Sequence, residues 1–218
     1  MKRILITTLL SSSLLLSTAA VAQQQAPIPP TLLQRIRQLL GLVQPIAAGG
    51  SRGDSKQLCL ISPYISSTRQ GAVTPTATPT LRVRQPLNEV RIEKDGRTVW
   101  RKVASSSQAI NGLIPWPLAP LQPGEHLELV LRARGASGAD LARVPLQAAS
   151  AEVLAQTRAV LDEITQNPQA WESAMDQALQ SNNKALAVVL LNARSSEASG
   201  SDAALEQLIQ STTCLGTP

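Results

Sequence analysis

The stretch EVRIEKDGRTVWRKV, residues 89–103, decides the fold because it has the pattern of a β-hairpin. The dipeptide Asp95-Gly96 at its centre lies between two runs that carry apolar residues, Val90 and Ile92 before it and Val99, Trp100 and Val103 after it. Glycine accepts the positive φ that a tight hairpin turn needs, so this dipeptide between two β-type runs is a strong turn signal. We therefore predict two antiparallel strands, Glu89–Lys94 and Arg97–Val103.

The pairing register of this hairpin has two alternatives. A two-residue turn pairs Ile92 with Val99 and leaves Trp100 on the other face. A three-residue loop that ends in a glycine bulge pairs Val90 with Trp100. Because a slip of one residue exchanges the two faces of a strand, burial of the large apolar Trp100 favours the bulged register. We expect Trp100 to anchor the hairpin in the core.

Further strands flank the hairpin in the sequence. Residues 125–134 alternate apolar with charged or polar side chains, the period of a half-buried strand, and Val130 is the one apolar residue on the solvent-facing side. Leu141–Gln147 is predicted as the last strand, and as an edge strand because Pro145 lacks a backbone N–H. Gln57–Ile61 and Leu81–Arg84 are strand-like as well. Short strands separated by regular turns predict an immunoglobulin- or fibronectin-like antiparallel β-sandwich.

The C-terminal part of the chain has helical spacing instead. Residues 153–164 carry one apolar face with the period of an α-helix. Asn167 is a good N-cap, and Pro168 suits the first position of a second helix. Ser181-Asn182-Asn183 separates a third helix, and a fourth precedes the tail. The predicted fold class is therefore α+β, a β-sandwich with a C-terminal α-helical region.

Residues Met1–Ala22 have the features of a secretory signal peptide. Lys2 and Arg3 give a positive start, an apolar run follows, and Ala20-Val21-Ala22 is a small-residue cleavage site. We therefore expect export to the periplasm or cell envelope. Cleavage of the signal and its retention as a membrane anchor both stay open.

Three further regions follow the signal. Residues 23–56 form a proline-rich spacer, a short amphipathic helix over Thr31–Val43 and a glycine-rich joint. The β-sandwich module covers residues 57–148, and the helical region and tail cover residues 149–218. The apolar stripe of Thr31–Val43 has two interpretations: peripheral contact with a membrane or partner, or docking on the protein's own domain.

The charge and the aromatic content argue against a nucleic-acid partner. The formal net charge is +5, and it falls to +3 once Lys2 and Arg3 leave with the signal. The sequence has no run of basic residues, and three Trp and one Tyr with no Phe give little aromatic surface on which bases stack. The core must be built from Leu, Val, Ile and Ala.

No group of residues in the sequence has the pattern of a catalytic site. A hydrolase acting by acid–base chemistry needs two carboxyl groups at a defined separation, but Glu125 and Glu128 point to opposite faces of their strand. One histidine and two distant cysteines are a poor set of metal ligands. His126 is expected to face solvent. We predict no enzyme activity, no cofactor and no metal site.

The sequence thus predicts an exported, non-catalytic envelope or periplasmic module that binds a protein or a cell-envelope glycan. The alternative is a secreted hydrolase with an unorthodox site. The oligomeric state, the biological process and the identity of the partner stay open.

A disulfide between Cys59 and Cys214 is the one covalent link that the sequence predicts. These are the two cysteines of the chain, and export would bring both to an oxidising compartment. The bond would fasten the C-terminal tail to the start of the β module. The alternative is a buried free thiol at Cys59 and an exposed one at Cys214.

Several turn-forming motifs carry a resemblance to a known family. They are Gly49-Gly50-Ser51-Arg52-Gly53 with Cys59 shortly after, Thr78-Pro79-Thr80-Leu81 and Leu121-Gln122-Pro123-Gly124. With these motifs the chain resembles a cyanobacterial family of exported proteins known as a domain of unknown function. The likeness covers roughly residues 49–193. It implies export and a β-sandwich followed by an α-helical tail, and it implies no activity and no site residues.

Overall fold

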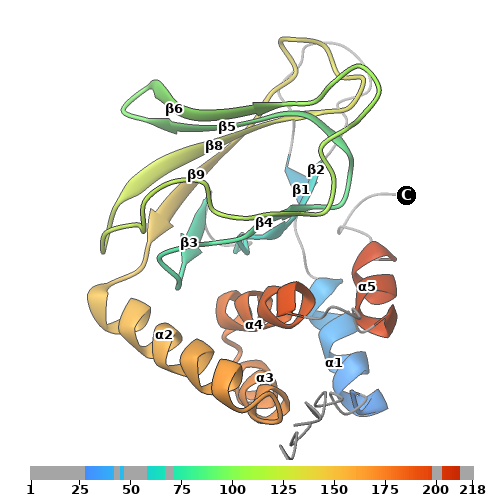
Figure 1. The fold of residues 1–218 in the computed structure, drawn as a ribbon, viewed down its shortest axis with the longest axis vertical. Coiled ribbons are helices and arrows are strands. Elements are labelled where there is room, and N and C mark those ends of the chain that lie inside the picture. Colours follow the sequence, from blue (N-terminus) through green and yellow to red (C-terminus); the bar gives the residue numbers. More distant parts are fainter. Residues whose placement is uncertain (1–27, 42–44, 47–57, 67–70, 198–202, 212–218) are drawn as a thin grey trace, which may run out of the picture.

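Two β-sheets and a group of helices make up the part of the chain that the structure describes (Figure 1). This computed structural model describes residues 28–41, 45–46, 58–66, 71–197 and 203–211. The first sheet has the strand order β1 (Pro45–Ile46), β2 (Leu58–Ser62), β4 (Leu81–Val83), β7 (Leu113–Ile114). The second has the order β3 (Ala72–Thr74), β9 (Ala142–Ala148), β8 (His126–Ala133), β5 (Leu87–Lys94), β6 (Arg97–Val103). The mixed α+β class is confirmed.

The two sheets bury a common apolar core. Strands of the second sheet alternate buried and more exposed residues, most regularly along β9, as expected for strands with one face in the core. Both sheets contribute aliphatic side chains that are almost fully enclosed, among them Leu58, Leu60, Leu81, Val90, Ile92, Leu129, Leu131 and Leu146. Leucine, valine, isoleucine and alanine supply this core, as the sequence predicted.

The hairpin forms, but neither predicted register is correct. Asp95 and Gly96 make a two-residue turn with φ values of 51° and 74°, and Lys94 pairs with Arg97. The register then shifts, and Trp100 lies opposite Ile92. The extra residue therefore sits within the strand at Val99 and not in the turn, where it returns Trp100 to the core face. Trp100 is half-buried against the core and not enclosed in it.

The prediction that β9 is an edge strand is wrong for its last residues. There β3 pairs with β9 in parallel, from Ala72 opposite Leu146 to Thr74 opposite Ala148. This pairing begins one residue after Pro145, since a residue without an N–H cannot extend the ladder. The second sheet is therefore mixed and not wholly antiparallel. The short strands β1, β3 and β7 were not predicted.

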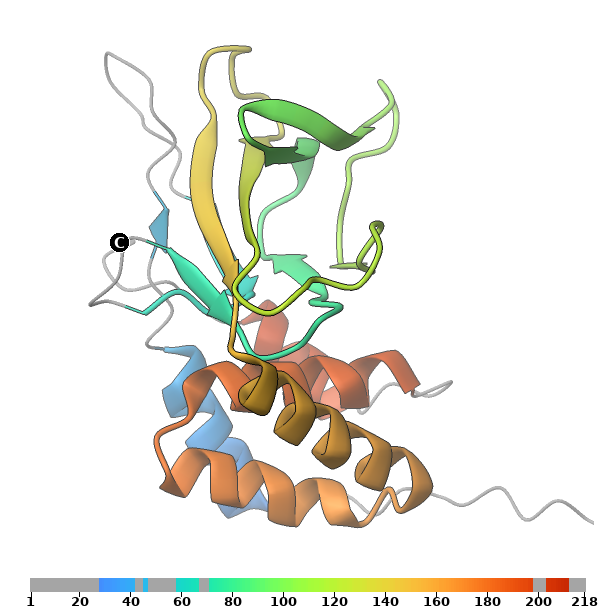
Figure 2. The same ribbon diagram turned by 90° about the vertical axis from the view of Figure 1, so that its left-hand side faces the viewer.

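Five described helices pack below the sheets (Figures 1 and 2). They are α1 (Pro30–Leu40), α2 (Ala151–Gln166), α3 (Ala170–Gln180), α4 (Lys184–Glu197) and α5 (Ala203–Gln210). The predicted N-cap at Asn167 is wrong: Asn167 is the C-cap of α2, and α3 begins after Gln169. The amide groups of Ala170 and Trp171 instead donate to the carbonyl oxygens of Asn167 and Pro168 in a tight turn.

The helices enclose a second apolar core, and α1 belongs to it. Leu32, Ile36, Leu39 and Leu40 of α1 are buried, and α1 contacts α3 and α5. Docking on the protein's own domain is thus the arrangement that the structure shows for this helix. Ile61 of β2 is fully buried in the same core, so the strand joins the sheets to the helices.

The remaining predictions about the N-terminus concern residues outside the described part of the chain. The signal at Met1–Ala22, the spacer residues before Ile28 and the glycine-rich joint lie there. Among the described helices, none has the length and apolar character needed to cross a membrane.

Candidate functional site

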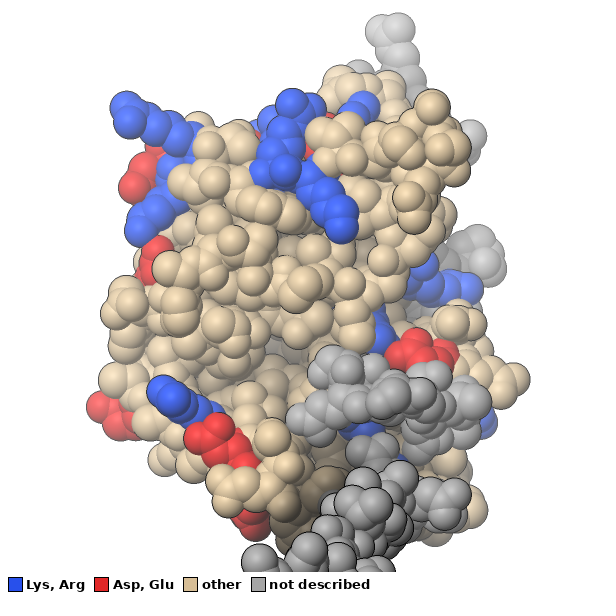
Figure 3. Space-filling view, in the orientation of Figure 1, with Lys and Arg blue, Asp and Glu red and all other residues tan. Residues whose placement is uncertain are grey.

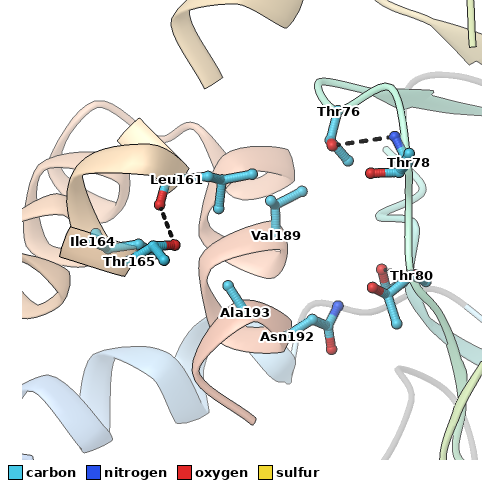
Figure 4. A pocket seen from close by; sticks show the side chains of 10 residues that line it. Thr76, Thr78, Thr80, Leu161, Ile164, Thr165, Val189, Asn192 and Ala193 are labelled. Carbon is cyan, nitrogen blue, oxygen red and sulfur yellow. Dashed lines mark hydrogen bonds between the residues drawn. The ribbon is translucent and has the colours of Figure 1, made fainter. Parts of the chain in front are cut away.

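A polar crevice of about 260 Å³ lies where the sheets meet the helices. Figure 4 shows three threonines of the β3–β4 connection on one side and residues of α2 and α4 on the other. We call it the threonine crevice. Its ten described lining residues are Ser62, Thr76, Thr78, Thr80, Leu161, Ile164, Thr165, Val189, Asn192 and Ala193.

Hydrogen bonds hold the threonine-bearing loop in place. Thr74 Oγ1 donates to Thr76 O at 3.2 Å, and Thr76 Oγ1 accepts from the amide of Thr78 at 3.4 Å. At the far end of the loop, Ser62 Oγ donates to Thr80 O at 2.6 Å. Local bonds of this kind are typical of Ser and Thr in turns. Threonines at alternating positions thus face one space, and the hydroxyls of Thr78 and Thr80 have no hydrogen bond to the described residues.

The helical wall of the crevice is mainly apolar. Leu161 and Ile164 come from α2, and Val189 comes from α4. Thr165 Oγ1 donates back to Leu161 O at 2.9 Å, a bond within α2. The crevice therefore presents hydroxyl groups on one side and aliphatic carbon on the other.

Asn192 is a polar residue on the helical wall whose side chain, unlike that of Thr165, makes no hydrogen bond. Asn192 is 3% exposed, and neither its Nδ2 nor its Oδ1 has a hydrogen-bond partner. Figure 4 shows its amide extending from α4 toward Thr80. Leaving a buried amide unpaired costs about 1–3 kcal/mol, so buried amides normally have a hydrogen-bond partner such as a protein group or an ordered water.

The chemistry of the crevice suits a small, neutral ligand. None of its ten described lining residues is ionisable, so it offers no charge to an ionic ligand. Its volume is slightly below the ~300–1,000 Å³ of pockets for drug-sized molecules. Hydroxyls and an amide match the donors and acceptors of a polyol, while the aliphatic wall suits C–H groups.

A second cluster of polar residues lies on the outer face of the larger sheet and is strongly charged. Glu89 accepts hydrogen bonds from Arg101 Nε at 2.7 Å and Arg132 Nη2 at 3.0 Å. Glu93 pairs with Arg143 at 2.9 Å, and Arg143 also contacts Glu128. These pairs connect β5, β6, β8 and β9 across the sheet, and opposite charges on neighbouring strands are stabilising.

The electrostatics of Glu89 follow from this cluster. Burial by itself raises the pKa of the Glu89 carboxyl, but the hydrogen bond from Arg101 and the charges of Arg101, Arg91 and Arg132 outweigh it. The pKa therefore lies below the ordinary value of 4.5. Val130 lies between Arg91 and Arg143 on this face and is fully buried, as expected where arginine stems cover apolar surface.

Glu125 and Glu128, the two acidic residues considered for a hydrolase, both form ion pairs in the structure. Glu125 pairs with Lys94 Nζ at 2.7 Å and accepts a hydrogen bond from the amide of Gln122. Both interactions hold the pKa of Glu125 low, the Lys94 bond most. Glu128 pairs with Arg143 on the outer face, and His126 is exposed as predicted. A secreted hydrolase stays the alternative prediction.

Cys59 is disulfide-bonded in the structure. It lies on β2 and is almost fully buried. The predicted partner, Cys214, lies outside the described residues. The pairing of Cys59 with Cys214 therefore stays a prediction.

Sequence reasoning missed the threonine crevice. The signal that marks it is the segment Thr74-Pro-Thr-Ala-Thr-Pro-Thr80, in which every second residue is threonine. A second signal is Asn192, a lone amide after the apolar run Ala185–Leu191 of α4. Neither signal predicts that the loop and the helix face each other. Across the described residues, no three His, Cys, Asp or Glu side chains are grouped as metal ligands would be.

Comparison with known proteins adds little to this geometry. No family model matches the chain, and no curated protein matches it. Among solved structures, the crystal structure of an engineered protein is similar at 20% identity and a TM-score of 0.25. That match covers 43% of this chain and 20% of the engineered one.

Proposed function

We propose that this protein is an exported, non-catalytic envelope or periplasmic module that binds a neutral glycan in the threonine crevice. The observation that carries the proposal is the buried Asn192 amide, which extends into a hydroxyl-lined space without a partner. A sugar hydroxyl both donates and accepts, so it satisfies Nδ2 and Oδ1 together. The aliphatic wall formed by Leu161 and Val189 would then face the C–H groups of the ring.

We also infer that the two sheets form a β-sandwich of the immunoglobulin or fibronectin type, in a chain related to the cyanobacterial exported family. The shared core of the two sheets supports the sandwich. The motifs at residues 49–53, 78–81 and 121–124 support the relationship. The predicted signal peptide supports export.

Peripheral membrane contact through Thr31–Val43 is less well supported than glycan binding. The apolar side chains that such contact requires are buried between α1 and the other helices. Membrane binding would therefore require α1 to leave the helical core. Fractionation of the exported protein, with and without residues 31–43, tests this proposal: an unchanged location in both forms rules it out.

Titration of the purified protein with neutral sugars tests glycan binding. We expect N-acetylglucosamine, glucose or their soluble oligomers to bind in calorimetry and to shift NMR signals of residues 76–80 and 189–193. Asn192→Leu should abolish binding, because it removes both polar atoms while keeping a similar volume. Asn111→Leu is the matched control, since Asn111 is exposed in a loop and does not line the crevice.

Two results would contradict the proposal. One is that none of these sugars binds to the wild-type protein. The other is that sugars bind equally well to the wild type and to Asn192→Leu, which would place the binding site elsewhere.

A further inference from the structure

The strand β6 forms one edge of the larger sheet. In the order β3-β9-β8-β5-β6, β6 pairs with β5 on one side. No described strand pairs with its other side, and Figures 1 and 2 show it at the end of the molecule away from the helices. An edge of seven residues presents unpaired N–H and C=O groups to which another extended chain can pair.

The side chains of β6 are unusually exposed for a strand with this sequence. Every residue except the half-buried Trp100 is exposed. Val99 and Val103 are 46% and 53% exposed, and they are two of the three large apolar residues exposed in the described structure. The sheet therefore ends in a strand with apolar contact points that the fold itself leaves uncovered.

The charges of β6 select the kind of partner. Arg97, Arg101 and Lys102 give this strand three positive charges and no negative one. Arg101 is paired with Glu89, whereas Arg97 and Lys102 form no ion pair with any described residue. Figure 3 shows basic side chains gathered at the end of the molecule that carries the β5–β6 hairpin. Pairing of two copies through β6 would bring these positive charges together, which disfavours self-association.

We propose that β6 accepts an acidic, extended segment of a partner protein, which adds to the larger sheet as a sixth strand. Main-chain hydrogen bonds to the free edge would supply affinity, as in other cases of strand addition. Acidic side chains would pair with Arg97 and Lys102, and apolar ones would cover Val99 and Val103. This site is independent of the threonine crevice, which lies at the junction with the helices.

Two blocked nine-residue peptides of opposite charge serve as probes, one alternating Glu with Val and one alternating Lys with Val. We expect the Glu peptide to bind in calorimetry, to bind more weakly as salt is raised, and to slow amide hydrogen exchange along β6. The Lys peptide should not bind. The double variant Arg97→Glu/Lys102→Glu should weaken binding of the Glu peptide about tenfold or more, because two attractions become repulsions.

The matched control is Arg37→Glu/Arg158→Glu, which makes the same charge change at exposed positions on α1 and α2. It should bind the Glu peptide as the wild type does. The proposal fails if the Glu peptide does not bind or if both double variants weaken it equally. It also fails if exchange along β6 is unchanged on binding. Dimerisation through β6 in ultracentrifugation, lost in Arg97→Glu/Lys102→Glu, would mean that a second copy occupies the edge instead.

Discussion

The guanidinium carbon of Arg194 lies 4.4 Å from the centroid of the Trp171 ring. Trp171 is 2% exposed, and its Nε1 donates a hydrogen bond to Leu190 O at 2.8 Å. Since both partners are on α4, Trp171 joins α3 to α4 through a cation–π contact and a hydrogen bond. This is the most completely enclosed of the three tryptophans.

Trp171→Ala should therefore destabilise the protein more than Trp100→Ala. Removing an enclosed aromatic side chain costs about 3–5 kcal/mol. Trp100 is half-buried at the sheet edge, so its removal leaves no closed cavity and should cost less. Urea denaturation of both variants measures the two losses of unfolding free energy. A larger loss for Trp100→Ala would contradict this ranking.

The hairpin shows what the sequence could predict and what it could not. Asp95-Gly96 identified the turn, because the positive φ values that the turn needs are adopted by these two residues themselves. The bulge at Val99 was not predictable, since it depends on how Trp100 meets a core made by other strands. The same holds for β3, which three pairings with β9 define across a wide sequence separation.

The candidate site was less predictable than the fold. Buried faces of strands and helices leave a periodic pattern in the sequence, so the α+β class could be derived from it. A crevice between two elements leaves no such pattern. Thr78 and Asn192 are far apart in the chain, and only the packing of α4 against the β3–β4 loop brings them to the same space.

Gly71→Ala should destabilise the pairing of β3 with β9. A Cβ at this position would lie 2.7 Å from Pro145 O and 3.1 Å from Pro145 Cβ. The backbone must move to relieve this contact, at a cost of about 1–3 kcal/mol. Gly138→Ala is the control, because a Cβ there meets nothing within 4 Å. Thermal unfolding of both variants tests the prediction, and equal midpoints would contradict it.

Glu89→Gln should destabilise the protein at neutral pH and much less in acid. The pKa of Glu89 in the folded protein lies below its ordinary value of 4.5. The ionised carboxylate therefore stabilises the fold above that pH, and the contribution disappears as the pH falls through the folded-state pKa. Replacing this hydrogen-bonded charge costs about 1–3 kcal/mol at pH 7.

Urea unfolding of wild type and Glu89→Gln at pH 7 and pH 3 measures the difference. The gap in unfolding free energy should narrow at the lower pH. Glu163→Gln, at an exposed position on α2, should show little gap at either pH. If the difference in unfolding free energy between wild type and Glu89→Gln does not change with pH, the packing of the side chain and not its charge is responsible.

If Cys59 is bonded to Cys214, reduction of this disulfide should destabilise the protein. The two positions enclose a long loop, and the chain-entropy model gives about 4–5 kcal/mol as an upper figure. Thiol labelling of the unfolded, unreduced protein tests the pairing directly. No label on monomeric chains is expected, and two labels per chain would rule the bond out.

Asn192→Leu should raise the stability of the sugar-free protein. An ordinary buried polar residue has its hydrogen bonds made, so its replacement by an apolar one destabilises. Asn192 has no partner for either amide atom, and its burial therefore costs about 1–3 kcal/mol, which leucine of similar volume would avoid. Asn183→Leu is the contrasting change, because Asn183 Oδ1 accepts a hydrogen bond from the amide of Leu186 at the start of α4. That variant should lose about 1 kcal/mol through the missing cap.

Unfolding of both variants without sugar measures the two effects. If Asn192→Leu gains unfolding free energy and loses sugar binding, Asn192 serves binding at the expense of stability. If it loses as much unfolding free energy as Asn183→Leu, ordered water already satisfies the Asn192 amide.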